Sequence, residues 1–169
     1  MGEYGITDRG LKPLRDFPAL RVLAVEKALV TDEGLAALIP LKIEDLSLFR
    51  CLSVTDAGLA HLAKMSQLTS LCLRDTSITS EGLAHVSRLK NLATLDLRDT
   101  TVDDGGIRHL ATLPSLARLL LSRALISDAG AAGLSDLRSL RLLDLSETGV
   151  TAGSLEELRH ALPACRVVP

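Results

Sequence analysis

Apolar residues recur at regular places along the chain, and two different spacings alternate. In "LTSLCLRDTSI" (68–78), Leu71 and Leu73 stand two residues apart, which places both side chains on one side of a strand. In "TDAGLAHLAKM" (55–65), Leu59, Leu62 and Met65 stand three apart, which keeps them along one side of a helical segment. The pattern therefore predicts short strands that alternate with short helices.

The whole pattern returns at a constant interval. Each repeat opens with a β-branched apolar residue that precedes Thr, Ser or Asp and has a small residue four places on. These anchors are Ile6, Val30, Val54, Ile78, Val102, Ile126 and Val150, each 24 residues after the last. Such a period, with Leu at fixed offsets, is typical of an array in which every unit buries its apolar face on the next. Residues 1–169 are predicted to form a single domain of about six to seven repeats.

The polar residue after each anchor marks the start of a helical segment. Its side chain can accept a hydrogen bond from the unpaired amides of the first helical turn, so it is predicted to be an N-cap. These residues are Thr7, Thr31, Thr55, Thr79, Asp103, Ser127 and Thr151. The glycines four places after the anchors are spread one per repeat and are not clustered as in a phosphate-binding loop. They indicate tight backbone geometry or close helix packing.

Composition narrows the classes of partner and compartment. Hydrophobic residues make up 47% of the chain and aromatic residues only 2%, so the core is expected to consist of aliphatic layers. The net charge of -2 gives no broad basic field, so neither nucleic acid nor membrane is expected as a partner. The chain has no apolar run of membrane-spanning length and no signal-peptide pattern at its start, and its cysteine count is odd. A soluble, cytoplasmic protein is expected.

The repeats resemble a known family. The segments "LTSLCLRDTSI" and "LATLDLRDTTV" resemble the leucine-rich repeat consensus L-x-x-L-x-L-x-x-N/C-x-L, and "TDAGLAHLAKM" is similar to the helical half of short bacterial repeats. The chain is also similar to the cysteine-containing subfamily found in F-box ubiquitin-ligase adaptors, with Cys51 as the structural cysteine. The resemblance implies an α/β fold: a leucine-rich repeat solenoid, or right-handed βα superhelix, with a parallel sheet on the concave face and short helices on the convex face.

Two departures concern the turns after the strands. In the second repeat one residue is missing before Ile43 and one is gained after Leu46, so the turn "FRCLS" (49–53) is expected to bend or bulge. Ala28 and Ala124 occupy the inward Asn/Cys position of the consensus but have no polar side chain. Those two turns are expected to need another hydrogen-bond donor or a water molecule.

Two further departures concern packing. In the sixth repeat Ala131 replaces the usual Leu, and Gly133 adds backbone entropy, so this helix is expected to be the weakest. The first repeat is only half a unit, and its apolar residues Leu11, Leu14 and Phe17 are expected to be partly uncovered. Either a preceding domain or a partner is expected to cover this N-terminal edge, and self-association through it is one possibility.

A solenoid of this kind presents the outward side chains of its strands to partners, because these residues are free of packing duty. The candidate partner-binding residues are Phe49, Arg74, Asp96, Arg98, Arg118, Leu120 and Asp144. In this interpretation the arginines, with Asp96 beside them, meet a partner's carboxylates, and Phe49 and Leu120 are apolar anchors. The alternative is a solvated face whose charges neutralise one another in a ladder.

No catalytic, metal or cofactor site is predicted. His61, His85 and His109 share a column, but helix packing keeps neighbouring repeats roughly 8 to 10 Å apart, which is too far for shared ligation of one ion. Cys72 lies in a strand column that contains no histidine to act as a base. The leading hypothesis is a non-catalytic module that binds a protein or peptide. The alternatives are a recognition or regulatory domain of a larger enzyme, such as a ubiquitin-ligase effector or adaptor, and a self-associating scaffold.

Overall fold

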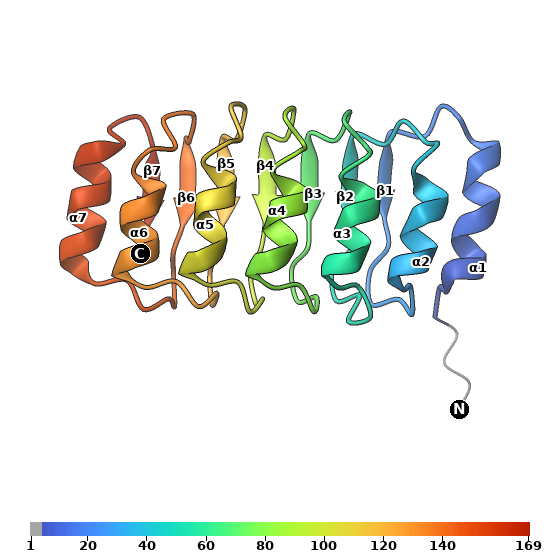
Figure 1. Ribbon diagram of the computed structural model, residues 1–169, viewed down its shortest axis with the longest axis horizontal. Coiled ribbons are helices and arrows are strands. Elements are labelled where there is room, and N and C mark those ends of the chain that lie inside the picture. Colours follow the sequence, from blue (N-terminus) through green and yellow to red (C-terminus); the bar gives the residue numbers. More distant parts are fainter. Residues whose placement is uncertain (1–4) are drawn as a thin grey trace.

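The computed structural model describes residues 5–169, which form one continuous strand-and-helix array (Figure 1). Within these residues the strands make a seven-stranded parallel sheet in the order β1 to β7, and the helices lie in a row on one side of it. The strands are β1 (Val22–Ala24), β2 (Asp45–Ser47), β3 (Ser70–Cys72), β4 (Thr94–Asp96), β5 (Arg118–Leu120), β6 (Leu142–Asp144) and β7 (Arg166–Val168). The helices are α1 (Asp8–Leu11), α2 (Asp32–Leu35), α3 (Asp56–Leu62), α4 (Leu83–Val86), α5 (Asp104–Leu110), α6 (Asp128–Leu134) and α7 (Ala152–Ala161), with 3-10 turns η1 (Lys12–Asp16), η2 (Ala36–Leu38) and η3 (Ser80–Gly82).

The strands are three residues long, and their central residue faces the helices. Leu46, Leu71, Leu95, Leu119 and Leu143 hold this place in β2 to β6 and are fully buried. Each is paired in register with its equivalent in the next strand. Because side chains alternate along a strand, the first and third residues point away from the helices. The register thus aligns the outward residues in the columns that the sequence predicts.

Aliphatic ladders fill the space between the sheet and the helices. The column eight places after the anchors contains Leu38, Leu62, Val86, Leu110, Leu134 and Leu158, all with at most 2% of their surface exposed. Burying such a side chain contributes about 1.5–3 kcal/mol, most of which offsets the entropy lost on ordering the chain. Each inner layer is covered by the layers on both sides of it, so the buried area depends on the stacking of neighbouring repeats.

A polar ladder joins the start of each helix to the repeat before it. Asp32 accepts hydrogen bonds from the backbone N–H and the hydroxyl of Thr55, at 2.8 and 2.6 Å, across 23 residues. The same double contact links Asp8 to Thr31, Asp56 to Thr79, Asp104 to Ser127 and Asp128 to Thr151.

One joint of this ladder has its donor and acceptor exchanged. Ser80 occupies the aspartate position and Asp103 the threonine position, and the Ser80 hydroxyl donates to the Asp103 carboxylate at 2.5 Å while accepting the Asp103 backbone N–H at 2.9 Å. The same two bonds form with the carboxylate on the other side. The pairing is therefore kept although both residue types have changed.

The predicted N-caps are confirmed in five repeats and wrong in two. Thr55, Thr79, Asp103, Ser127 and Thr151 accept a hydrogen bond from an amide of their own helix. Thr7 and Thr31 make no side-chain cap bond. The Thr31 hydroxyl faces two carboxylates instead, at 2.8 Å from Asp8 and 2.6 Å from Glu33.

The ladder explains the glycine column. A Cβ atom on Gly34, Gly58, Gly82 or Gly130 would lie 2.1 to 2.4 Å from a carboxylate oxygen of the preceding repeat's ladder aspartate. The backbone dihedral angles of these glycines are within reach of any residue, since no glycine among the described residues has a positive φ. Close helix packing, and not backbone geometry, therefore accounts for these residues.

The slip in the second repeat changes the hydrogen bonding of the turn at 49–53. The Val54 N–H bonds to the Cys51 carbonyl within the turn. In the matching turns of other repeats, a backbone N–H bonds to the carbonyl of the preceding anchor residue, as in Leu29 to Ile6, Ser77 to Val54 and Leu125 to Val102. The Cys51 thiol is buried and lies 3.1 Å from the Val25 carbonyl, in the repeat that contains Ala28. The extra hydrogen-bond donor that the Ala28 turn was expected to need is thus the Cys51 thiol of the next repeat, which donates to the Val25 carbonyl.

The N-terminal repeat is more exposed than the C-terminal one. Phe17 is 60% exposed and Val22 65%, whereas Leu11 is buried, so the expectation of an uncovered edge is right for Phe17 and wrong for Leu11. At the other end, α7 and β7 keep Leu155, Leu158 and Val167 buried. Within residues 5–169 no helix is long and apolar enough to cross a lipid bilayer.

Candidate functional site

We call the outward side of the sheet, away from the helices, the strand face. It is formed by the first and third residue of each strand and the residue two places beyond the strand. All seven candidate residues lie on it: Phe49 after β2, Arg74 after β3, Asp96 in β4, Arg98 after β4, Arg118 and Leu120 in β5, and Asp144 in β6. Most of these side chains are half-buried, Asp96 is buried and Arg118 is exposed.

The turn that follows each of the first six strands contains a charged residue in the left-handed backbone region. These residues are Lys27, Arg50, Asp75, Asp99, Arg123 and Glu147, with φ between 52° and 60°. For a residue with a Cβ this region costs roughly 1–2 kcal/mol. In five of the turns the N–H of this residue bonds to a carbonyl of the next repeat, as Asp75 does to Arg98 at 3.0 Å, and these bonds help to offset the cost. The turns place a row of charges along one margin of the strand face.

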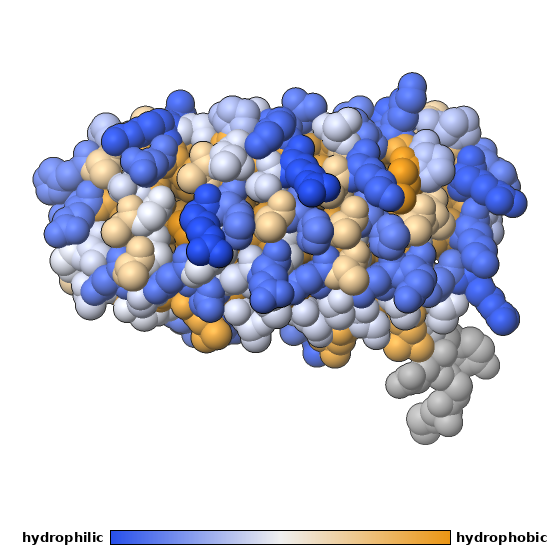
Figure 2. Space-filling view, viewed as in Figure 1, coloured by the Kyte–Doolittle hydropathy of each residue, from blue (hydrophilic) through white to orange (hydrophobic). Residues whose placement is uncertain are grey.

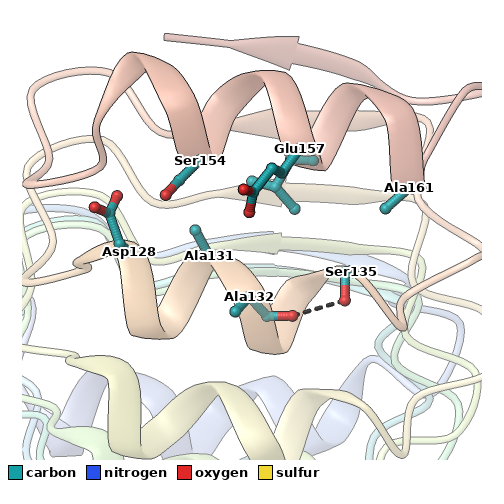
Figure 3. Close-up of a pocket in the computed structure, with 8 residues that line it drawn as sticks. Asp128, Ala131, Ala132, Ser135, Ser154, Glu157 and Ala161 are labelled. Carbon is teal, nitrogen blue, oxygen red and sulfur yellow. Dashed lines mark hydrogen bonds between the residues drawn. The ribbon is translucent and has the colours of Figure 1, made fainter.

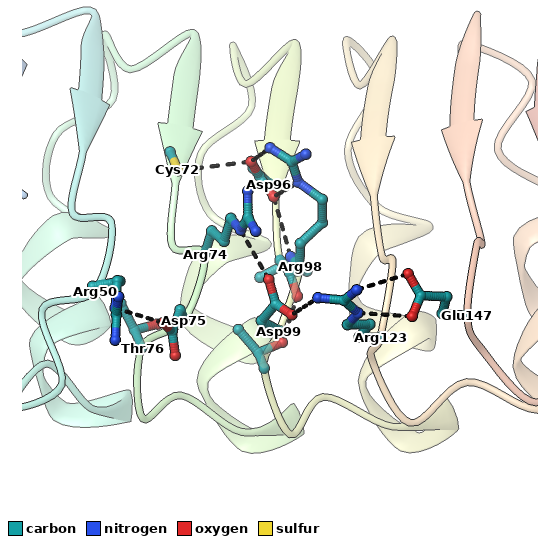
Figure 4. A network of polar contacts seen from close by, with 12 residues as sticks. Arg50, Cys72, Arg74, Asp75, Thr76, Asp96, Arg98, Asp99, Arg123 and Glu147 are labelled. Carbon is teal, nitrogen blue, oxygen red and sulfur yellow. Dashed lines mark hydrogen bonds and ion pairs between the residues drawn. The ribbon is translucent and has the colours of Figure 1, made fainter.

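Ion pairs join this row across repeats (Figure 4). Asp99 lies between two arginines, 2.8 Å from Arg74 and 3.4 Å from Arg123, and Arg123 in turn contacts Glu147 at 2.9 Å. Arg50 pairs with Asp75 at 3.0 Å. Burial alone would raise the pKa of Asp99, but the hydrogen bonds and charges of Arg74 and Arg123 outweigh it and lower that pKa. Exposed pairs of this kind contribute about 0–1 kcal/mol each, so the network orients side chains more than it stabilises the fold.

A second cluster lies on β3 and β4. Asp96 is 6% exposed and accepts two bonds from the Arg98 guanidinium, at 2.9 and 2.6 Å, and one from the Arg98 backbone N–H at 3.1 Å. The hydrogen bond to Asp96 raises the pKa of Arg98. Cys72 lies 3.7 Å from the same carboxylate, and burial raises the pKa of its thiol. The thiol is therefore kept protonated, which is the opposite of what a nucleophilic cysteine needs.

Phe49 lies between two cations. The Arg74 guanidinium is 5.3 Å from the ring centroid and the Lys27 ammonium 6.0 Å, within the range of a cation–π contact. The predicted apolar anchor is therefore partly covered by side chains of its own chain. Together with the ion pairs, this contact joins Lys27, Phe49, Arg74 and Asp99 in one continuous row.

The structure thus connects some of the predicted residues and leaves others apart. Phe49 and Arg74 belong to the row of charges, and Asp96 and Arg98 form their own pair, whereas Arg118, Leu120 and Asp144 lie in neither. The ion-pair partners in the row were missed because several acids are near each arginine in the sequence columns. Arg74, for example, is followed directly by Asp75 but pairs with Asp99 of the next repeat.

The helix-bearing side contains a cleft. Polar and apolar side chains are interspersed across this face (Figure 2). Between α6 and α7 a cleft of about 170 Å³ lies where Ala131 replaces Leu. Its lining includes Asp128, Ala131, Ser154, Glu157 and Leu158, and Figure 3 shows the first four of these side chains between the two helices. α6 nevertheless keeps the seven-residue length of α3 and α5. The part of the chain that the structure describes contains no group of three or more His, Cys, Asp or Glu side chains able to hold a metal ion.

Comparisons with known proteins identify the fold. No protein-family model and no curated protein matches the sequence. Among solved structures, the chain is similar to an internalin (inlF) from Listeria monocytogenes, with a TM-score of 0.71 and 21% sequence identity over 93% of this chain and 49% of that one. It is also similar to an internalin C2 (inlC2) from Listeria monocytogenes, with a TM-score of 0.70 and 23% identity over 98% of this chain and 77% of that one.

The fold is an α/β leucine-rich repeat solenoid, as the sequence predicted. The chain spans about half the length of the first of these internalin structures. At such low identity the similarity concerns the fold alone.

Proposed function

We propose that the chain is a non-catalytic module that holds a protein or peptide on its strand face. The main support is the contrast between two kinds of column. The inward columns keep the same aliphatic residues from repeat to repeat, whereas the outward column of β1 to β6 changes from Val22 and Asp45 through Ser70 and Thr94 to Arg118 and Leu142. Residues that vary without a packing role are available to recognise a partner.

The internal contacts of the strand face are compatible with this role. An arginine carries five N–H donors, and Arg74 uses only its Nε in the bond to Asp99. Arg98 is held by two bonds to Asp96 and still has unused donors. A guanidinium that is already oriented loses less conformational entropy when it binds a carboxylate. The candidate set therefore stays Phe49, Arg74, Asp96, Arg98, Arg118, Leu120 and Asp144.

A steric block tests this function. Ser70 and Thr94 are adjacent on β3 and β4, and their half-buried side chains lie in the middle of the strand face. The variant Ser70→Arg/Thr94→Arg would cover this area without breaking an ion pair. Reversing the charge of Arg98 with Arg98→Glu would be a poorer test, since it would place a second carboxylate beside the buried Asp96. The matched control is Ala57→Arg/Ala111→Arg, which adds the same charge and bulk at exposed positions on the helix side.

The readout is affinity capture from a lysate of the source organism, with folding of each variant checked by circular dichroism. We expect the unmodified chain and the control to capture the same specific proteins and the strand-face variant to lose them. If the strand-face variant captures the same proteins as the unmodified chain, the strand face is not the binding surface.

The exposed N-terminal edge favours a second candidate function. Ile6, Phe17 and Val22 are half or more exposed at the first repeat. We propose that this edge is covered in one of two ways. The cover is either a further domain of a larger enzyme, as in the cysteine-containing F-box adaptors that the repeats resemble, or a second copy of the chain. A mass that rises with concentration in light scattering, and returns to the monomer value in a Phe17→Glu variant, would support self-association.

A further inference from the structure

Two rows of side chains cross the last three strands on the strand face. In register, Leu142 of β6 lies between Arg118 of β5 and Arg166 of β7, and Asp144 lies between Leu120 and Val168. We call these six residues the β5–β7 patch. Neighbouring strands are about 4.8 Å apart, so the backbones of Arg118 and Arg166 are separated by about 9.6 Å. The leucine between them forms an apolar floor.

The two arginines differ from the other arginines of this side. Each of the others contacts a carboxylate: Arg50, Arg74, Arg98 and Arg123 have one within 3.0 Å. Arg118 and Arg166 are exposed and form no ion pair with any residue from 5 to 169. They are therefore the two unneutralised cations of the patch.

The acids nearby are already engaged. Asp96 is buried and holds Arg98 through two bonds. Asp144 accepts hydrogen bonds at one oxygen, Oδ1, from the backbone N–H and the hydroxyl of Ser146, at 3.0 and 2.5 Å. Neither carboxylate makes a direct contact with Arg118, although Asp144 keeps a negative charge between the two arginines. The patch therefore has two free cations, one central anion and three half-buried apolar side chains.

We infer that the β5–β7 patch binds an acidic segment of a partner protein, with one carboxylate at Arg118, a second at Arg166 and the backbone of the segment crossing over Leu142 between them. This inference rests on the proposed function and narrows it to one part of the strand face. In an extended segment, alternate side chains lie about 7 Å apart on one side. The flexible arginine side chains close the remaining few ångströms, so the matching segment has the pattern acidic, any residue, acidic, with apolar residues close by.

A nucleic acid fits the same arginines less well. Single-stranded nucleic acids are held by stacking on aromatic side chains, and the patch contains none. Asp144 would also lie beneath the phosphates, and the chain as a whole carries a net charge of -2. A carboxylate pair needs only two fixed donors, which the patch supplies. An acidic protein segment is therefore the favoured ligand.

The experiment uses a display library of short random peptides selected on the full chain. Enriched peptides are synthesised with a fluorescent label, and their affinity is measured by anisotropy for the unmodified chain and three variants. Arg118→Glu/Arg166→Glu reverses the two free charges. Arg88→Glu/Arg108→Glu makes the same charge change at exposed positions on the helix side and is the matched control. Asp144→Asn removes the central negative charge.

We expect the enriched peptides to carry paired acidic residues flanked by apolar ones. Charge reversal should weaken their binding by about tenfold or more, because two charge-assisted contacts become repulsive. The control should change it little, and Asp144→Asn should strengthen it, which a merely unfolded variant could not do. Added salt should weaken binding by the unmodified chain.

Three results would overturn the inference: selected peptides without an acidic preference, binding that survives reversal of Arg118 and Arg166, or tighter binding of a labelled single-stranded oligonucleotide than of any acidic peptide. The proposed function would remain in each case if Ser70→Arg/Thr94→Arg still abolished protein capture. If the steric block had no effect on capture but reversal of the two arginines weakened the peptides, the patch would bind acidic segments without the wider strand face being the interface.

Discussion

Gly82→Ala tests the hydrogen-bonded ladder that joins the repeats. A Cβ atom at this position would lie 2.3 Å from Asp56 Oδ1 and 2.8 Å from Leu59 Cδ1. The leucine methyl can rotate away, but the carboxylate is held by Thr79, at 2.8 Å from its N–H and 2.6 Å from its hydroxyl. Asp56 must therefore move, and the added methyl group breaks both bonds.

The expected loss follows from two opposing contributions. Each hydrogen bond to a charged group contributes about 1.5–3 kcal/mol, and the two bonds of this exposed pair, at the lower end of that range, together contribute about 3 kcal/mol. Replacing Gly by Ala in a helical segment returns up to about 1 kcal/mol. The net prediction is a decrease of about 2 kcal/mol in the free energy of unfolding, measured by urea denaturation followed by circular dichroism. The Thr79 amide should also exchange its hydrogen faster.

Two companion variants make the test specific. Asp56→Ala removes the group that clashes, so Gly82→Ala should become neutral or slightly stabilising in that background. Gly153→Ala is the matched control, because its Cβ would meet nothing closer than Thr151 Oγ1 at 3.9 Å. The ladder argument fails if Gly82→Ala is as stable as the unmodified chain, or if its penalty persists after Asp56 is removed.

Three further outcomes are expected. Ala131→Leu should fill part of the cleft between α6 and α7 and raise the free energy of unfolding by about 1–2 kcal/mol, and an equal or lower value would show that the cleft cannot accept the side chain. The hydrogen bond from Ser80 lowers the pKa of Asp103, so its contribution to stability is present above the unfolded-state pKa of about 3.9 and is lost as the pH falls below it. Ser80→Ala should raise the pKa of Asp103 in an NMR titration and flatten the acid side of the stability profile; an unchanged pKa would contradict this. The Cys51 thiol is buried, with a raised pKa, and should react with a thiol reagent only at the rate of unfolding, whereas rapid labelling of the folded chain would contradict that placement.

The repeat period predicted most of the fold, because the features that determine it are local and regular. The two-residue step of Leu71 and Leu73 identified the inward side of a strand, and the strand register confirmed the outward columns. Such inferences succeed when each repeat supports the same conclusion.

Contacts between repeats were harder to predict than the repeats themselves. Thr31 was interpreted only as a cap for its own helix, but it makes no cap bond, and its hydroxyl contacts Asp8, 23 residues earlier. The aspartate column beside the threonines was in the sequence, but a rule for local caps does not consider it. The left-handed turns gave no signal at all, since charged residues such as Arg123 stand where glycine or asparagine would be expected.

The candidate binding residues illustrate a third limit. Their place on the strand face followed from alternation, but their pairing did not. Arg98 has Asp96 and Asp99 near it in the sequence and pairs with the buried Asp96. Arg118 forms no ion pair within residues 5–169. Long side chains select partners by distance and burial in three dimensions, so a sequence column shows only which partners are available. The binding role of the set stays a prediction.

The exchanged joint at Ser80 and Asp103 has a consequence for how this array can be lengthened or shortened. Each repeat contributes one residue to the ladder joint with the repeat before it and one residue to the joint with the repeat after it. Because of the exchange, deleting one particular repeat brings two residues together that cannot form these bonds. Removing the unit that begins at Ile78 would bring Asp56 against Asp103, two carboxylates with no hydroxyl between them. Removing that unit together with the next would bring Asp56 against Ser127, the pairing already used at Asp104. The unit that begins at Ile78 can therefore be removed without opposing two carboxylates only if the unit that follows it is removed as well.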